Sequence, residues 1–381
     1  MLEDKNLKIA LVHDFLNQYG GAEKVLEALC EMFPTAPIYT LIYDKERMGE
    51  KFSNREIRTS FLQKLPKFFR RRFKLFLLFL PTAPESFDLR QFDLIISSSG
   101  AWSKGIITRL DTIHIAYIHS PMRFVWDYNE KYLRDERKEK LSFFIRPILS
   151  YFRIWDKLAA DRPDHLIANS KYTRDRIEKY YRRESEVIYP PVNHETYNMK
   201  HKTITDNEKY FLIVSRLSAY KKIDKAIEAF NKLELPLVIV GTGKEEERLK
   251  KIAKSNIKFL GYQKDEKLPE IYEKARAFIF PGVDDFGIAP VEAMMHGISV
   301  IAIKAGGVVE IIEEGKTGEF FESSMPEVIA DGVRRFCENE KNYDKEYIKK
   351  SVERFGKERF KKEMEEYINH VTRNMKHETE K

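Results

Sequence analysis

Runs of apolar and β-branched residues alternate with helical patterns along the first half of the chain. The residues at 94–96 and 115–118 are apolar almost without interruption, which predicts strands covered on both faces, as in a parallel sheet. Helical periodicity between the runs predicts crossover helices that join parallel strands. We therefore expect one sheet from the segments 8–15, 38–43, 93–99, 113–119, 165–169 and 187–189.

A second series of strand patterns begins at Tyr210 and also alternates with helical stretches. The Pro-Pro-Val-Asn-His stretch at 190–194 interrupts all periodicity and predicts an interdomain linker. A chain of 381 residues exceeds the size at which one hydrophobic core usually stops growing, so two domains are expected. The strands predicted for the second sheet are 211–215, 237–240, 257–260, 276–280 and 299–303.

The expected fold is α/β, with two doubly wound domains in series. The first domain covers 1–190, the linker 191–200 and the second domain 201–350. A polar helix within 351–381 follows, and its own pattern does not say which domain it packs on. Ligands of such sheets bind at the carboxyl ends of the strands, so the cleft between the domains is the expected site.

Composition narrows the class of protein further. Hydrophobic residues make up 43% and charged residues 33%, which is typical of a soluble globular protein. No stretch approaches the roughly 20 apolar residues of a spanning helix, and no secretory segment precedes the strand at 9–12, so a cytoplasmic protein is expected. The net charge of +7 suits an anionic partner, but no nucleic-acid-binding motif is present and no nucleic acid is expected. The two cysteines, Cys30 and Cys337, predict free thiols.

Two carboxylates, Asp284 and Glu292, lie eight positions apart across a predicted join between a strand and a helix. Pro290 suits the first turn of that helix and Gly297 its end. Glu292 is expected in the first turn, where it can accept hydrogen bonds from ribose hydroxyls, while Asp284 in the loop can reach a sugar ring. The alternative is that Glu292 complements the helix dipole and that Asp284 is a turn residue.

This segment resembles the acid-x7-acid signature of retaining family 4 glycosyltransferases, in which Glu-Gly-Phe-Gly usually precedes Glu-Ala-Met-Ala-Cys-Gly. Asp284 and Asp285 stand in place of the first Glu and Gly, so the first carboxylate reaches about one methylene less far. The resemblance implies a GT-B fold, a last helix that returns to the first domain, and no cofactor or obligatory metal. It also implies that Phe286, Gly287 and Ile288 contact the nucleotide sugar.

Two segments of the first domain follow predicted strand ends. The loop at 13–24 contains Gly20 and Gly21, which permit close backbone approach ahead of a helix N-terminus, although many such turns carry glycine for conformational reasons alone. The resemblance places this loop beside the diphosphate and acceptor. His119 begins a His-x-Pro pattern, at which family 4 enzymes place a histidine that contacts the donor sugar; the alternative is a core histidine.

In the second domain, Arg216 and Lys221 are two cations five residues apart at a strand end, which suits the growing charge of a departing diphosphate. The resemblance assigns them that role, and a solvated basic turn is the alternative. Glu310 matches the family's Gly-Gly-x-x-Glu segment beside the nucleotide. The Gly-Thr-Gly at 241–243 predicts a tight turn, because Glu246 occupies the third glycine position of a dinucleotide motif.

The segment 64–80 mixes six cations with many Leu and Phe residues. This composition is typical of an interfacial helix on anionic lipid, which would attach the protein reversibly to the inner face of the cell membrane. A partly buried helix with a solvated basic face explains the same residues.

The order of motifs predicts a retaining transferase that moves a hexose from a nucleotide-diphosphate sugar to a lipid-linked or polysaccharide acceptor. The string at 119–127, with Ser97-Ser98-Ser99 and Lys104-Gly105 upstream, resembles mannosyltransferases of O-antigen and surface-polysaccharide synthesis, so GDP-mannose is the first donor to consider. A non-catalytic glycan- or lipid-binding protein, which Asp284 would suit, and a GT-B epimerase or phosphorylase are the alternatives.

Overall fold

The computed structural model describes residues 7–71, 77–130, 142–192 and 209–379. It divides into two compact units. The first contains the described residues up to Pro191 together with those from Lys357 onward, and the second runs from Val192 to Gly356. Residues 72–76 of the basic segment and 193–200 of the expected linker lie outside the described residues.

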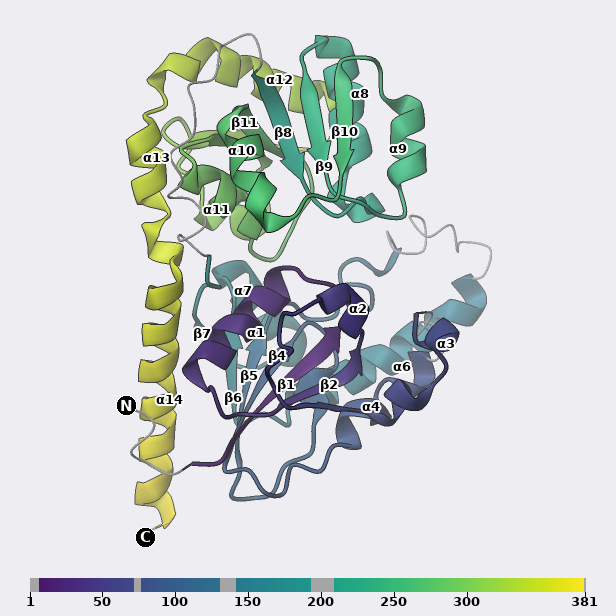
Figure 1. Cartoon of the computed structure of the whole chain (residues 1–381), viewed down its shortest axis with the longest axis vertical. Helices are drawn as coiled ribbons and strands as arrows, with labels where there is room; N and C mark the ends of the chain where they lie inside the picture. Colours follow the sequence, from purple (N-terminus) through teal and green to yellow (C-terminus); the bar gives the residue numbers. More distant parts are fainter. Residues whose placement is uncertain (1–6, 72–76, 131–141, 193–208, 380–381) are drawn as a thin grey trace. The chain divides into compact units, whose positions relative to one another are not determined.

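A parallel sheet with the order β3-β2-β1-β4-β5-β6-β7 forms the centre of the first unit, within the described residues (Figure 1). The central strands are buried along their whole length, as the uninterrupted apolar runs predict. The strands are β1 (Ile9–Leu16), β2 (Ile38–Tyr43), β3 (Ile57–Thr59), β4 (Leu94–Ser99), β5 (Ile113–Ile118), β6 (His165–Ala168) and β7 (Glu186–Val187).

The helices of the first unit are α1 (Gly21–Met32), α2 (Lys45–Met48), α3 (Lys67–Arg71), α4 (Thr82–Glu85), α6 (Ser142–Ala160), α7 (Lys171–Tyr181) and α14 (Lys357–Thr379). The last of these completes the core, because Phe360, Met364, Ile368 and Val371 follow helical spacing and pack in one cluster with α1 and the sheet. At about 1.5–3 kcal/mol for each buried side chain, this contact contributes on the order of 10 kcal/mol. Figure 1 shows α14, in yellow, beside the first unit.

The described part of the second unit holds a parallel sheet with the order β10-β9-β8-β11-β12-β13. The strands are β8 (Tyr210–Val214), β9 (Leu237–Val240), β10 (Ile257–Gly261), β11 (Ala275–Phe280), β12 (Ser299–Ile303) and β13 (Gly318–Phe321). The helices are α8 (Ile223–Leu233), α9 (Glu246–Ile252), α10 (Leu268–Glu273), α11 (Ile288–Met295), α12 (Pro326–Asn339) and α13 (Lys345–Ser351). Two doubly wound α/β domains are therefore confirmed.

Each sheet has a point at which the strand order reverses. From β8 the chain builds outward through β9 and β10, and then returns to β11 on the other side of β8. In the first sheet the same reversal falls between β1 and β4. Loops that leave the carboxyl ends of two such neighbouring strands diverge to opposite faces, which leaves a crevice suited to a ligand. The candidate residues of both units lie at these two points.

Candidate functional site

Lys221 and Asp284 form an ion pair at the reversal point of the second unit, next to the ends of β8 and β11. Lys221 ends the short 3-10 helix after β8, and Asp284 lies in the loop after β11. The ammonium of Lys221 donates to the Asp284 carboxylate, with the side chains 14% and 21% exposed. The same ammonium lies 5.7 Å from the centre of the Phe280 ring. A partly buried, partly exposed cation at a strand end is available to an anion that competes with Asp284 for it.

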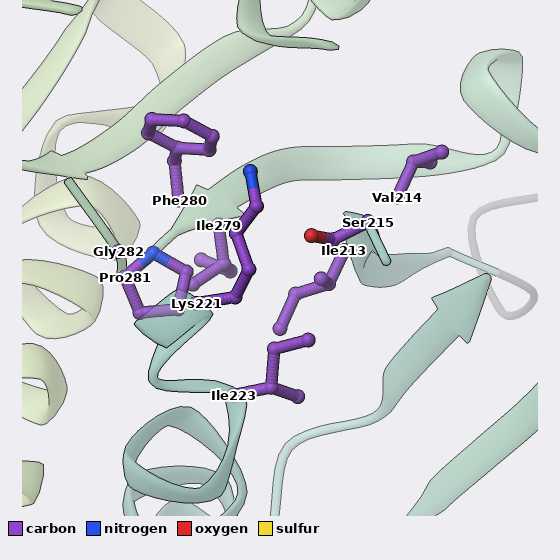
Figure 2. Close-up of a pocket in the computed structure, with 9 residues that line it drawn as sticks. All are labelled: Ile213, Val214, Ser215, Lys221, Ile223, Ile279, Phe280, Pro281 and Gly282. Atoms are coloured by element: carbon purple, nitrogen blue, oxygen red, sulfur yellow. The ribbon is translucent and has the colours of Figure 1, made fainter. Parts of the chain in front are cut away.

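A pocket lies beside this ion pair, between the ends of β8 and β11. Figure 2 shows the Lys221 side chain rising between Phe280 and Ser215. The remaining lining residues are Ile213, Val214, Ile223, Ile279, Pro281 and Gly282. The pocket therefore has mostly apolar walls, and the ammonium of Lys221 is the charged group that its lining contributes.

Glycines allow the loops of this site to touch. A Cβ added to Gly282 would lie 2.7 Å from the Lys221 Cα, and one added to Gly307 would lie 2.2 Å from the Asp285 carbonyl oxygen. The backbone amide of Gly307 also donates to the carbonyl oxygen of Asp284, at 3.0 Å. Real Cβ atoms do not approach backbone this closely, so the loops after β8, β11 and β12 can pack only with glycine at these positions.

The Gly-Thr-Gly turn at 241–243 also allows two backbone segments to pack closely, a role that the sequence did not reveal. A Cβ on Gly241 would lie 2.0 Å from the Ser215 carbonyl oxygen, and one on Gly243 would lie 2.1 Å from that of Leu217. The Leu217 amide donates to the Thr242 carbonyl oxygen, at 2.9 Å. The turn thus supports the loop that carries Arg216, whose side chain is exposed.

The structure corrects the expected place of Glu292. Helix α11 begins at Ile288, after Gly287 with φ of 111°, so Glu292 is its fifth residue and lies beyond the first turn. Pro290 lies in the first turn and Gly297, with φ of 72°, follows the helix end, as predicted. The Glu292 side chain is buried, and the Tyr272 hydroxyl donates to its Oε2 atom at 3.3 Å.

The other predicted residues of this unit surround the same loops. Phe286 is buried edge-on against Phe355, with ring centres 5.2 Å apart, and is therefore a packing residue of the loop. Gly287 and Ile288 form the start of α11, where backbone amides are directed out of the helix. Glu310 ends the short 3-10 helix after β12, and Arg354 donates to its carbonyl oxygen.

In the first unit a hydrogen-bonded chain of side chains crosses the reversal point. His13 of β1 and Ser98 of β4 are register partners, and His13 Nδ1 lies 3.1 Å from Ser98 Oγ. Ser98 Oγ lies 2.7 Å from Nε2 of His119, the residue after β5. Burial, together with the nearby His13, lowers the pKa of His119 to about 3. The predicted site histidine is therefore a neutral imidazole at physiological pH.

Asp14 organises the loop after β4. Its carboxylate accepts hydrogen bonds from four consecutive backbone amides, those of residues 100–103, at 2.6 to 3.0 Å. The loop continues into Lys104, whose ammonium pairs with Asp156 of α6 at 2.6 Å, with both side chains almost fully buried. Gly20 and Gly21 lie on the other side of His13, at the start of α1, with Glu23 of the same turn 3.5 Å from His13 Nε2.

Sequence reasoning missed Asp14, Ser98 and Glu23 as parts of this site. The run Ser97-Ser98-Ser99 was the available signal, since three hydroxyls inside a fully buried strand require partners. Among the described residues there is no group of three or more His, Cys, Asp or Glu side chains placed to hold a metal ion.

Two family models match consecutive parts of the chain. One, described as Glycosyltransferase Family 4, covers residues 19–196, and the other, described as Glycosyl transferases group 1, covers residues 195–354. The chain belongs to the family 4 type of GT-B glycosyltransferases. The reversal point of the second unit falls inside the matched regions, whereas β1 and α14 of the first unit lie outside them.

Individual relatives are more distant. The α-1,3/1,6-mannosyltransferase ALG2 of Dictyostelium discoideum is 21% identical over 83% of this chain and 86% of its own length. The O-antigen chain mannosyltransferase RfbU of Salmonella typhimurium is 26% identical over 53% of this chain and 62% of its own. Matches to four other curated relatives span 36% to 63% of those proteins' lengths. A solved structure of Anabaena HepE in complex with UDP-glucose superposes with a TM-score of 0.70 at 17% identity, over 95% of this chain and 99% of its own.

Proposed function

We propose that this protein transfers a hexose from a nucleotide-diphosphate sugar to a glycan or lipid-linked acceptor, with retention of the anomeric configuration. The observation that carries the proposal is Lys221 at the reversal point of the second sheet, partly exposed, beside Asp284 and five positions from the exposed Arg216. Two cations at a strand end suit the diphosphate leaving group. A stabilising group of this kind contributes about 10²–10³-fold in rate.

In the proposed step the bond between the sugar and the diphosphate oxygen breaks, and the acceptor oxygen bonds to the anomeric carbon on the same face. The acceptor proton passes to the leaving phosphate oxygen, so no carboxylate nucleophile is needed. Arg216 and Lys221 neutralise the developing charge, for which we propose that no metal is obligatory. Asp284 and His119 contact the sugar, and Glu292 the ribose.

The remaining predicted residues line the substrates in this proposal. Gly287 and Ile288 offer the amides of α11 to the nucleotide, Phe286 holds their loop, and Glu310 borders the same subsite. Gly20 and Gly21 place the N-terminus of α1 beside the diphosphate and the acceptor.

We propose GDP-mannose as the first donor to test, in surface-polysaccharide or O-antigen synthesis. The mannosyltransferase names of ALG2 and RfbU support this choice. UDP-glucose is the second, because the fold-level neighbour HepE was crystallised with it. Purified protein is assayed for binding and hydrolysis of GDP-mannose, UDP-glucose, UDP-N-acetylglucosamine and UDP-galactose, with and without EDTA. Binding of one donor with turnover that Lys221→Ala removes supports the proposal, whereas binding without turnover supports the non-catalytic alternative.

We also propose that the protein attaches reversibly to the cytoplasmic face of an anionic membrane. In the described residues no helix is both long and apolar enough to cross a bilayer. However, α6 exposes an apolar stripe at spacings of three and four residues, made of Phe144, Pro147, Tyr151, Ile154 and Leu158. The flanking charged positions of this face are all cationic, namely Arg146, Arg153 and Lys157. An anionic lipid surface suits this combination of apolar and cationic side chains, of which Arg146 pairs with Glu130 and Lys157 with Asp161.

The basic segment 64–80 shares this side of the first unit. Its residues Leu65, Leu77 and Leu80 pack in one cluster with the inner face of α6, while Phe68, Leu78 and Phe79 are exposed. The buried side chains support the interpretation of a helix packed on its own domain, and the exposed side chains support the proposed membrane contact. The stripe and the exposed Phe68, Leu78 and Phe79 are the described apolar side chains that this proposal assigns to the lipid surface.

Co-sedimentation with neutral and anionic vesicles, at low and high salt, tests this attachment. Changing Arg70, Arg71 and Arg72 together to Glu should remove the preference for anionic vesicles, because each cation contributes about 1 kcal/mol. Ile154→Ser with Leu158→Ser should weaken binding to both, whereas Tyr262→Ser, an exposed apolar position of the second unit, serves as the control. Equal binding by all variants would exclude this surface.

A further inference from the structure

A chain of polar contacts in the first unit extends from Glu23 through His13 and Ser98 to His119, and its last two contacts are hydrogen bonds. The Glu23 Oε1 atom lies 3.5 Å from His13 Nε2, and the next two contacts measure 3.1 and 2.7 Å. Glu23, His13 and Ser98 are 5%, 2% and 0% exposed, so water does not compete for these contacts. His119, which is only partly buried, is the one member that a substrate can reach.

The number of protons available to His13, Ser98 and His119 decides the direction of the hydrogen bonds between them. The Ser98 hydroxyl carries one proton, so it donates to one imidazole and accepts from the other. The Glu23 carboxylate faces His13 Nε2 and favours the tautomer with its proton there, in which His13 Nδ1 is an acceptor. Ser98 then donates to His13, and its oxygen accepts the Nε2 proton of His119. His119 Nδ1 is left with a lone pair.

We propose that Glu23, His13 and Ser98 are positioning residues that fix His119 as the Nε2–H tautomer, with Nδ1 as a hydrogen-bond acceptor. No hydrogen bond from Nδ1 occurs within the described part of the chain, and the Tyr117 ring packs edge-on against the imidazole at 5.3 Å. The sugar hydroxyl that His119 contacts must therefore donate its proton. This substrate requirement rests on the proposed function, whereas the tautomer does not.

The tautomer is measured directly by nitrogen-15 NMR of histidine-labelled full-length protein near neutral pH. The His119 signals are assigned by their loss in His119→Asn. The proposal expects a protonated Nε2 and an unprotonated Nδ1 in the wild type. A protonated Nδ1 with an unprotonated Nε2 would overturn it, because Ser98 would then donate to His119.

The chain offers a matched control for the role of Ser98. The neighbouring Ser97 is equally buried and bonds to Nε2 of His114 at 2.8 Å, but His114 is fully buried within β5 and cannot meet a substrate. Ser98→Ala should give mixed His119 tautomers and lower kcat/KM about tenfold, which corresponds to the loss of one hydrogen bond. Ser97→Ala should leave the His119 spectrum unchanged and kcat/KM within about twofold.

The outcomes separate the two proposals. If His119 is the Nε2–H tautomer in a protein that turns over no donor, the positioning role of Glu23, His13 and Ser98 is supported and the transferase function is refuted. If the enzyme turns over donor and Ser98→Ala leaves the His119 spectrum unchanged, only the proposed positioning of His119 is refuted. In an active enzyme, a donor analogue with fluorine in place of the contacted hydroxyl cannot donate a proton, so it should lose as much kcat/KM as the deoxy analogue does. Full activity with the fluorinated donor would show that His119 donates.

Discussion

Replacement of Lys104 by Met tests the most completely buried ion pair in the described part of the protein. Lys104 is 1% exposed and its partner Asp156 is not exposed at all. The Asp156 carboxylate also accepts from the Trp126 indole and the Tyr181 hydroxyl, each at 2.8 Å. In Lys104→Met these two donors remain, but the carboxylate loses its counter-charge inside the core.

Breaking a buried pair in this way costs about 3–5 kcal/mol. With a urea slope of about 2–3 kcal/mol per molar, the unfolding midpoint of the first unit should fall by about 1–2 M. The double variant Lys104→Met with Asp156→Leu removes both charges and should recover part of this loss, while the Trp126 indole and the Tyr181 hydroxyl lose their acceptor. Such recovery is expected because two apolar groups of similar shape leave no charge buried alone.

Tryptophan fluorescence measures this unfolding selectively. All three tryptophans, Trp102, Trp126 and Trp155, belong to the first unit, so the signal reports on that unit. Far-UV circular dichroism follows the backbone of both units, so the part of its change that does not accompany the tryptophan signal is the internal control and should not shift. A loss below 1 kcal/mol in Lys104→Met, or a double variant less stable than either single one, would refute the reasoning.

Four further outcomes follow from the structure. Lys221→Ala should reduce transfer about 10²-fold in a steady-state assay while its unfolding midpoint stays near that of the wild type; near-normal turnover would remove it from the site. Asp284→Glu should retain more activity than Asp284→Ala, and equal rates for wild type and Ala would reduce Asp284 to a turn residue. Gly282→Ala should cost about 1–3 kcal/mol in urea unfolding and displace Lys221, whereas Gly332→Ala, whose nearest atom lies at 3.5 Å, should not destabilise. Burial raises the pKa of Cys30 to about 12, so its reaction with a thiol reagent at neutral pH should occur only through unfolding, and fast native-state labelling would contradict the burial.

The fold followed from the sequence because hydrophobic periodicity is a local signal. Six strands of the first sheet, five of the second, the end of β11 at Pro281 and the helix stop at Gly297 are visible in neighbouring residues, whereas the edge strands β3 and β13 were not predicted. The start of α11 was wrong by enough to misplace Glu292, because Gly287 adopts a left-handed conformation that only the packed loop reveals. Side-chain identity alone does not encode that φ angle.

The site was predictable only in part, for the same reason. Lys221 and Asp284 are 63 positions apart, yet both follow strand ends that sheet order makes neighbours, so their proximity could be expected. The contact of His13 with Ser98 depends on register, and a shift of one residue would turn Ser98 to the other face. The close approach of Gly241 to Ser215 is likewise a property of packed backbones.

The route of the chain through the two units has a consequence for synthesis. The segment up to Pro191 leaves the ribosome first, but its core lacks Phe360, Met364, Ile368 and Val371 until the last helix is made. The second unit is continuous from Val192 to Gly356, and its ends meet where Val192 pairs with Gly356. Domains usually complete their folding in the order of translation. Here the second unit is completely synthesised before the first unit is. The apolar surface of the first unit therefore stays uncovered until α14, which begins some 170 positions after Pro191, has been made.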